Sequence, residues 1–492
     1  MLKSGIDKSG IIYFHNIVQN ITCMYKSFIS SVFLLLNLAA LSQIKQDPQL
    51  AKSIDSLVAP RFDGNQPGIS ILIAKKGQVV YQKAFGSANI ELNTPMQPDM
   101  VFRIGSITKQ FTAVAILQLV EQGKISLQDS IQKYIKDFPS KGHTITIENL
   151  LTHTSGIVDY TSKDDPDPYI ERRDFTAQLL INYFKDDPLH FKPGSKYEYS
   201  NSNYLLLGYI VQLVSGEDYH QYMADHVLKP AGLEHTLYAE EHTAVPGRVQ
   251  GYTHYSGSFD NCDYQTLSLG FACGDLLSNA EDLLKWNQAV VSGKLISEAS
   301  VKKAFSPYKL ANGTYSGYGY GWFIDTLYGS PCIHHEGQTS GFVALEKYFP
   351  KEDIYVTILT NVKTADDKTD FSDNRFRLFD KIGQVASGKE LIKEVKLDDK
   401  TLNSYTGTYQ WDSPSAKSGK NRLFIRLENG KLYGNLSNGT GKNMYLSPQS
   451  VTMFVLPDVK RIYTTIEFII NNGQVTGLYW TQEEKSKFNK VL

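Results

Sequence analysis

A serine and a lysine three positions apart are the first residues in this chain whose types and spacing could do chemistry. The stretch FRIGSITKQFTAVAILQLVEQG, residues 102–123, places Ser106 and Lys109 at the start of a mostly apolar run. A lysine amine next to a hydroxyl can activate it as a nucleophile. The same spacing recurs elsewhere in the chain, for example at Ser42, Ser300 and Ser306. Spacing alone therefore does not identify a nucleophile, and the surroundings must decide.

The surroundings of Ser106 favour a nucleophile. It follows an apolar, strand-like segment and a glycine, and it lies in the first turn of an expected helix. The free N–H groups and the positive dipole end of a helix stabilise anions at that position. Lys109 lies on the same face. Because a buried lysine is costly unless it is paired or neutral, a lysine in this apolar run indicates a function.

Two further stretches could complete a site. YEYSNSNYLLLGYIVQLVSG, residues 197–216, places Tyr199 and Asn201 before another apolar helix. Tyr199 could serve as a base or a proton relay if an adjacent ammonium lowers its pKa from about 10. CIHHEGQTSGF, residues 332–342, predicts an edge-like strand running into glycines. Such a strand can pair with an extended substrate and offer a backbone N–H group to a developing oxyanion.

The elements that must position these residues predict an α+β fold. Two strands are expected around a turn at residues 75–77, and further strands return after residue 317. Strands at both ends with helices between them indicate one antiparallel sheet that is flanked by helices. The expected helices cover residues 48–58, 109–123, 126–138, 174–186, 203–216, 219–232 and 279–293.

The last hundred residues differ from the rest of the chain. After a linker at residues 386–395, residues 396–492 read as short strands with turn signals between them. The Asn-Gly pairs at 429–430 and 472–473 lie between alternating runs and predict tight hairpins. We therefore expect a small all-β domain, a sandwich or a barrel. It contains no catalytic constellation, so a structural role is expected.

The N-terminal region predicts a targeting segment. MYKSFISSVFLLLNLAALSQ, starting at Met24, has a lysine, a short apolar stretch and small residues ending at Ser42. This pattern is typical of a signal peptide, so residues 1–42 are expected to be removed, with Met24 as a candidate true start. A periplasmic or extracellular location follows, with residues 43–385 as the catalytic domain. The alternative is an uncleaved segment that anchors the chain in a membrane.

Composition and missing motifs exclude several classes of protein. The net charge is −1 without a long basic run, so no nucleic-acid partner is expected. The chain has neither C-x-x-C nor a Cys/His cluster with zinc spacing, so no metal or cofactor is expected. Cys262 and Cys273 could form a disulfide in an oxidising compartment, but the sequence does not decide this. The absence of G-x-S-x-G argues against an α/β-hydrolase.

Three motifs together resemble a known family. Ser106-x-x-Lys109, Tyr199-x-Asn201 and His335-x-Gly337, in this order, are similar to the active-site motifs of the class C β-lactamase family. That family also holds penicillin-binding-protein-like D-alanyl-D-alanine carboxypeptidases, D-aminopeptidases and esterases. LLTHTSGI, YSNSNYLLLG and YGYGWF resemble its framework segments, and the likeness covers about residues 50–385. It implies a β-lactamase-like fold with a helical subdomain beside the sheet. The C-terminal region resembles a β-rich extension found on some members.

The resemblance also implies the catalytic roles. Ser106 would form an acyl-enzyme, Lys109 would be its amine partner, and Tyr199 would be the base or the proton shuttle. The backbone N–H groups of Ser106 and Gln338 would form the oxyanion hole. His153 of LLTHTSGI is expected to be a hydrogen-bonded structural histidine at a helix end. Glu148 and Asp159 are expected to be surface or capping groups.

The substrate-binding positions show one departure from the family. Asn201, His335 and Gly337 would contact the substrate, but His335-Glu336-Gly337 stands where β-lactamases carry Lys-Thr-Gly. The change removes a lysine and a hydroxyl that suit a β-lactam carboxylate, and it adds a negative charge. We therefore expect a hydrolase of D-amino-acid peptides or small esters and amides, and the partner to be a small molecule or a cell-wall peptide. A β-lactamase and a non-catalytic cell-wall-peptide-binding or scaffold protein are the alternatives.

Overall fold

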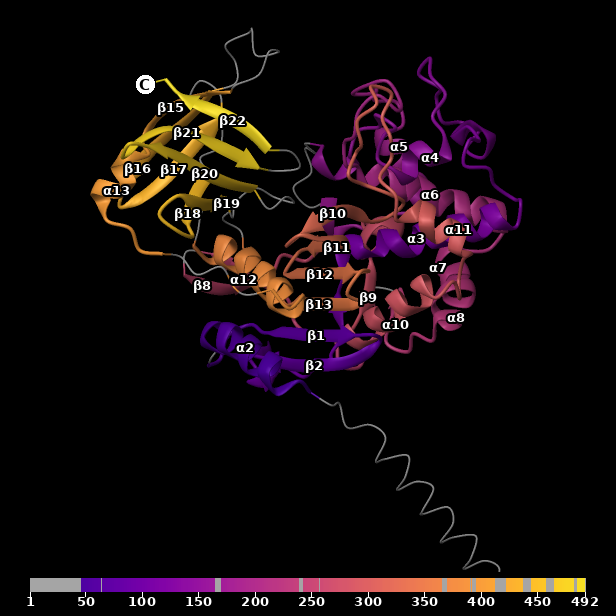
Figure 1. Ribbon diagram of the computed structural model, residues 1–492. Coiled ribbons are helices and arrows are strands. Elements are labelled where there is room, and N and C mark those ends of the chain that lie inside the picture. Colours follow the sequence, from indigo (N-terminus) through magenta and orange to yellow (C-terminus); the bar gives the residue numbers. More distant parts are fainter. Residues whose placement is uncertain are drawn as a thin grey trace, which may run out of the picture. The chain divides into compact units, whose positions relative to one another are not determined.

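The computed structural model describes most of the chain after residue 45 (Figure 1). The described residues are 46–62, 64–163, 170–238, 242–255, 257–364, 370–389, 391, 395–411, 422–436, 444–456, 464–481 and 485–491. The described residues from Asp47 onward belong to one compact unit. The predicted signal peptide lies outside the described residues. Within them, no helix has the length and apolar character that a membrane span requires.

The main sheet has six antiparallel strands in the order β10-β11-β12-β13-β1-β2 (Figure 1). One of them, β11, carries the third predicted motif. Its strands are β1 (Ile69–Lys75), β2 (Gln78–Phe85), β10 (Phe323–Leu327), β11 (Ser330–Thr339), β12 (Phe342–Phe349) and β13 (Ile354–Thr360). β1 pairs with β13, which confirms the prediction that both ends of this region build one sheet. β1 and β2 are joined by the predicted turn, with positive φ angles at Lys76 and Gly77.

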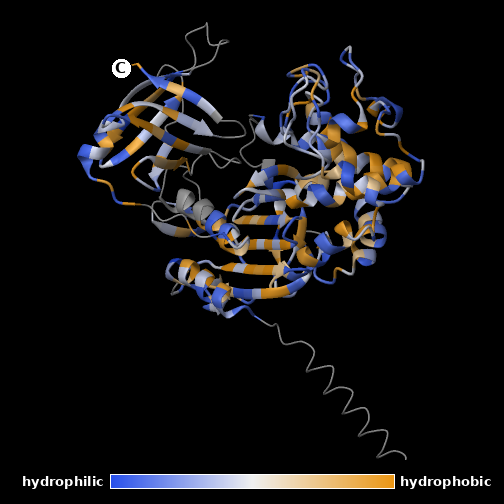
Figure 2. Ribbon diagram, viewed as in Figure 1, coloured by the Kyte–Doolittle hydropathy of each residue, from blue (hydrophilic) through white to orange (hydrophobic). Residues whose placement is uncertain are grey.

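The two faces of the sheet bury different helices, because successive side chains of a strand point to opposite sides. Ile69, Ile71 and Ile73 of β1 pack into one core with α2 (Pro48–Val58) and α12 (Asp370–Ala386). Leu72 and Ala74 face a second, larger core that includes α3 (Thr108–Glu121), α6 (Asn201–Ser215) and α10 (Ala280–Val291). Figure 2 shows apolar residues along the central strands and these helices.

Further helices form the helical subdomain that the resemblance implied, and the described residues also contain three small sheets. The other helices are η1 (Ala59–Arg61), η2 (Gly105–Ile107), η3 (Ile131–Lys133), α4 (Ile147–Leu151), η4 (Tyr160–Ser162), η5 (Ile170–Arg172), α5 (Ala177–Phe184), α7 (Tyr219–Met223), the π-helix η6 (Ala224–Leu228), α8 (Lys229–Ala231), α9 (Phe271–Gly274) and α11 (Glu298–Ala304). The small sheets contain β3 (Ser87–Asn89), β4 (Thr94–Pro95), β5 (Phe102–Arg103), β6 (Leu237–Tyr238), β7 (Tyr252–Tyr255), β8 (Ser258–Asn261), β9 (Leu276–Ser278) and β14 (Val362–Thr364).

The prediction of a helix at residues 126–138 was wrong. Residues 126–138 contain turns and the single 3-10 turn η3 in place of an α-helix. The Asp129 carboxylate accepts a hydrogen bond from the Ser126 N–H group at 2.8 Å, and the Ile131 N–H group donates to the Ile145 carbonyl at 2.9 Å. These bonds satisfy the backbone outside a helix. Local aspartate bonds of this kind compete with helix formation.

The C-terminal domain is a closed eight-stranded antiparallel barrel, β15 to β22 in chain order, with β15 and β22 closing it. The helix α13 (Asp399–Ser404) precedes it, and its strands are β15 (Gly407–Trp411), β16 (Arg422–Glu428), β17 (Lys431–Leu436), β18 (Met444–Pro448), β19 (Met453–Leu456), β20 (Thr464–Asn471), β21 (Gln474–Thr481) and β22 (Lys485–Lys490). Both Asn-Gly pairs have positive φ angles between paired strands, so both predicted hairpins are confirmed.

Candidate active site

Ser106 lies in η2, the 3-10 turn that leads directly into α3. The helix starts here because Gly105 adopts a φ of +51°, a conformation that glycine reaches at little cost. α3 itself is buried on nearly every face, in keeping with its apolar sequence. Ser106 is the partly exposed residue at its head. The predicted nucleophile is thus accessible at the end of a rigid, buried element.

Lys109 is completely buried one turn further along, and its Nζ atom meets three oxygen atoms. They are Ser106 Oγ at 3.1 Å, Asn201 Oδ1 at 2.7 Å and the Cys273 carbonyl at 2.8 Å. Burial lowers the pKa of Lys109 below its ordinary value, and the nearby Cys273 and Asp159 offset part of this effect. Lys109 therefore loses its proton more easily than a lysine in water does.

Tyr199 approaches the same group from the segment before α6. Its ring lies 4.9 Å from Lys109 Nζ, and its hydroxyl forms a hydrogen bond with Ser106. Burial raises the pKa of Tyr199 well above 10, although the bond to Ser106 acts in the opposite direction. A role as base would require a lowered pKa, which the neighbouring ammonium was expected to favour, but desolvation of the phenolate outweighs that effect.

Asn201 is the first residue of α6, and its amide is fully engaged within the protein. Oδ1 accepts from Lys109, while Nδ2 donates to Asp159 Oδ2 at 3.2 Å and to Thr161 Oγ1 at 2.9 Å. Asp159 also caps η4, as expected for a capping group. In this structure Asn201 holds Lys109, whereas the resemblance implied a contact with the substrate amide.

Strand β11 comes into direct contact with η2 through two glycines. A Cβ atom on Gly337 would lie 1.9 Å from the Ile104 carbonyl oxygen, and one on Gly105 would lie 2.8 Å from Gln338 N. The last residue of β11 that pairs with β10 is His334, and the part of β11 that follows approaches η2. The backbone N–H groups of Ser106 and Gln338 therefore come close together, as an oxyanion hole requires.

His335 occupies a different environment from the one implied by the resemblance. It is 1% exposed, its Nε2 atom lies 3.0 Å from the Tyr318 hydroxyl, and its Nδ1 atom lies 2.6 Å from the Glu336 carbonyl. Because a carbonyl only accepts, Nδ1 donates and Nε2 accepts from Tyr318 in the neutral ring. Both ring nitrogens of His335 thus bond within the protein. The next residue, Glu336, is partly exposed.

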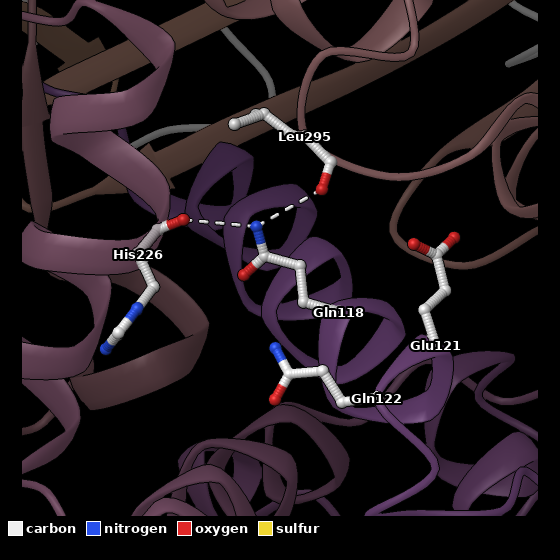
Figure 3. Close-up of a pocket in the computed structure, with 5 residues that line it drawn as sticks. All are labelled: Gln118, Glu121, Gln122, His226 and Leu295. Carbon is white, nitrogen blue, oxygen red and sulfur yellow. Dashed lines mark hydrogen bonds between the residues drawn. The ribbon is translucent and has the colours of Figure 1, made fainter.

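A cavity of about 150 Å³ opens in front of Ser106. Its lining contains the predicted Ser106, Asn201 and Gln338, and also Arg103, Tyr160, Thr161, Gln265, Leu269, Gly270, Cys273, Gly274 and Thr339. The residues of this second group have no motif in the sequence that marks them as site residues. The Cys273 contribution is a backbone carbonyl, for which no side-chain signal exists. A separate hollow of about 280 Å³ contains none of the predicted site residues (Figure 3).

The cysteines do not form the disulfide that the sequence left open. In the part of the chain that the structure describes, Cys262, Cys273 and Cys332 are all free thiols. Burial raises the pKa of each. Cys273 contributes to the site through its backbone, since its carbonyl accepts the Lys109 hydrogen bond and its thiol lies against Tyr160.

Comparison with known sequences gives consistent matches. A family model described as Beta-lactamase matches residues 50–378. The putative penicillin-binding protein PbpX of Bacillus subtilis (strain 168) is 34% identical over 293 residues, which are 59% of this chain and 70% of that protein. Protein flp of Staphylococcus aureus (strain MW2) is 31% identical over 328 residues, which are 64% of this chain. The match spans 63% of protein flp, slightly less than two thirds of its length.

Solved structures extend the comparison to the fold. The octameric penicillin-binding protein homologue from Pyrococcus abyssi has a TM-score of 0.59 at 26% identity, with 90% of this chain and 99% of that chain covered. D-amino acid amidase from Ochrobactrum anthropi SV3 has a TM-score of 0.60 at 23% identity, with 69% of this chain and 97% of that chain covered. The second likeness is one of fold alone.

Proposed function

The chain belongs to the Beta-lactamase family of serine hydrolases, and we propose that it hydrolyses D-amino-acid peptides or small esters and amides through an acyl-enzyme on Ser106. The observation that carries this proposal is the set of three oxygen atoms around Lys109 Nζ. The proposed reaction assigns one task to each group that meets there.

The neighbours of Lys109 match a neutral amine. Such an amine has two N–H donors and one lone pair, and two of its neighbours, Asn201 Oδ1 and the Cys273 carbonyl, can only accept. The third neighbour, the Ser106 hydroxyl, can donate into the lone pair. Lys109 would therefore remove the proton of Ser106 as Oγ attacks the substrate carbonyl. Its lowered pKa supports this role.

Tyr199 suits the other half of the proton transfer. Its raised pKa keeps the hydroxyl protonated, so it can donate but is a poor resting base. It would pass a proton to the leaving group and recover one from Lys109. The negative charge on the carbonyl oxygen would be held by the backbone N–H groups of Ser106 and Gln338, each worth about 3 kcal/mol in the transition state. Water would then release the acyl group by the same route in reverse.

The strand beside the cavity supports amide or ester substrates over β-lactams. At the position of the family's Lys-Thr-Gly, His335 is buried and Glu336 is a partly exposed charge. A lysine that would attract a substrate carboxylate is missing from these positions, and Glu336 would repel one. D-amino acid amidase, a solved structure with the same fold, is named for an amide substrate.

The first test is the release of p-nitrophenol from p-nitrophenyl acetate by residues 43–492. We expect a burst followed by turnover in the wild type and in Ser306→Ala, which removes an exposed serine with the same S-x-x-K spacing. Ser106→Ala should show neither. Equal rates in all three proteins would exclude Ser106 as the nucleophile and favour a binding protein. A panel of D- and L-amino-acid amides, D-alanyl-D-alanine peptides and a chromogenic cephalosporin then ranks the substrates.

We also propose that the protein is exported, with cleavage after Ser42. The support is the pattern of a lysine, an apolar stretch and small residues between Met24 and Ser42. N-terminal sequencing of the protein recovered from the outside of producing cells tests this. A chain that keeps residues 1–42 in the membrane fraction would indicate an anchor in place of a cleaved signal.

A further inference from the structure

His153 carries two energetic costs at one position. It is completely buried and has a φ of +54°, which is uncommon for a residue other than glycine. Its Nδ1 atom accepts from the Ser200 N–H group at 3.2 Å and from Asn203 Nδ2 at 3.1 Å, so the ring proton is on Nε2. Nε2 has no hydrogen-bond partner among the described residues. Strain and an unpaired buried donor at one residue indicate a role other than stability.

The contacts of His153 converge on Tyr199 from both sides along the chain. The Glu198 N–H group donates to the His153 carbonyl at 3.0 Å, and the Ser200 N–H group donates to its ring. The residues immediately before and after Tyr199 are therefore both fixed to His153. In addition, the two rings are in contact, with centroids 4.3 Å apart and a tilt of 35° between their planes.

The neutral state of His153 is part of this arrangement. Burial lowers its pKa well below 6.5, and Lys109 and His335 act in the same direction. Protonation at Nδ1 would turn the acceptor of the Ser200 bond into a donor, and it would place a positive charge near Lys109. The imidazole thus supplies what Tyr199 needs here, namely a flat apolar face and one fixed acceptor.

We propose that His153 is the positioning residue for Tyr199, holding its backbone and its ring so that the hydroxyl reaches Ser106. This inference rests on the proposed function, because it concerns how the proton shuttle is aimed. His153 does not touch the substrate cavity, whose lining residues do not include it. Because Tyr199 would move a proton in acylation and in deacylation, the effect of His153 should appear in the rates of both steps, and therefore in kcat, and not in substrate affinity.

Two variants separate the ring from the acceptor. His153→Asn keeps an acceptor near the position of Nδ1 and tolerates the positive φ, but it lacks the ring that lies against Tyr199. We expect kcat for p-nitrophenyl acetate to fall roughly 10-fold, with KM within about twofold. His153→Ala loses both and should fall roughly 100-fold, since a displacement of about 1 Å can cost that much. We therefore expect kcat to decrease in the order wild type, His153→Asn, His153→Ala.

A control variant separates positioning from loss of stability. Asn149→Ala removes the capping box of α4, the helix just before His153, but leaves the bonds to residues 198 and 200 in place. We expect its melting temperature to fall as in the His153 variants, and its kcat to stay within about twofold of wild type. In a Tyr199→Phe background, His153→Asn should have little further effect on kcat, because both changes act through the same hydroxyl.

The outcomes distinguish this inference from the proposed function. If Ser106→Ala retains the burst, the proposed function fails, whatever the His153 variants do. If the burst depends on Ser106 but His153→Asn matches Asn149→Ala in kcat, His153 is structural and the inference is wrong. Additive losses in the Tyr199→Phe background would also overturn it. A non-additive loss confined to kcat supports it.

Discussion

A buried carboxyl group behind the site makes the stability of this protein depend on pH in an unusual direction. Glu346 of β12 is directly opposite His335 in the sheet and 4% exposed. Its oxygens accept hydrogen bonds from Gln110, which follows Lys109 in α3, and from the Tyr355 hydroxyl. Burial nevertheless raises the pKa of Glu346 to about 7. The folded protein therefore favours the protonated form.

The sign of the effect follows from proton counting. Between the ordinary pKa of 4.5 and about 7, the folded state binds more protons at Glu346 than the unfolded state does. The free energy of unfolding must then decrease as the pH rises through this interval. One pH unit is worth about 1.4 kcal/mol, so the whole interval corresponds to about 3 kcal/mol at most. Glu346→Gln removes the titration and keeps the size and polarity of the side chain.

Urea unfolding at pH 5 and pH 8 measures this contribution. The stability of Glu346→Gln relative to wild type should increase by up to about 3 kcal/mol from pH 5 to pH 8. The transition is followed by fluorescence and by loss of p-nitrophenyl acetate hydrolysis, so that unfolding of the catalytic domain is identified. Glu234→Gln, at an exposed position, is the control for the same substitution elsewhere on the chain. An equal difference between Glu346→Gln and wild type at both pH values would refute the reasoning.

Three other substitutions test the site and the barrel. Gly337→Ala should lower kcat roughly 100-fold with unchanged circular dichroism, because its Cβ would push β11 away from the Ile104 carbonyl and widen the oxyanion hole. Asn201→Asp should move the acid limb of the pH–rate profile to higher pH, because a carboxylate in contact with Lys109 raises the pKa of the amine. Gly430→Ala should destabilise the barrel by about 1 kcal/mol in thermal unfolding without changing the esterase rate, because its φ is +71°.

The sequence predicted those parts of the fold that local patterns encode. The turn at Lys76-Gly77 and the two Asn-Gly hairpins were found because positive φ angles require few residue types. The expected helix at residues 48–58 coincides with α2. Residues 126–138 misled the same reasoning, because the polar bonds of Asp129 that replace the helix are not visible in a hydrophobic pattern.

The candidate site was predicted as a set of residues but not as a set of contacts. The motifs bring Ser106, Lys109 and Tyr199 together as expected, with Lys109 3.1 Å from Ser106. The burial of His335 and the Cys273 carbonyl depend on how distant segments pack, which spacing along the chain does not encode. The pKa of Tyr199 was misjudged for the same reason, because desolvation by the surrounding rings is a property of the folded state.

Asn201 explains how a lysine so close to a carboxylate can have a lowered pKa. Its amide lies between Lys109 and Asp159, with Oδ1 toward the amine and Nδ2 toward the carboxylate. Direct contact with Asp159 would form an ion pair and hold Lys109 as an ammonium. With the amide between them, the attraction of Asp159 is weaker than the effect of burial, and the pKa of Lys109 falls. The same residue type that could have bound the substrate thus sets the protonation state of the proposed base.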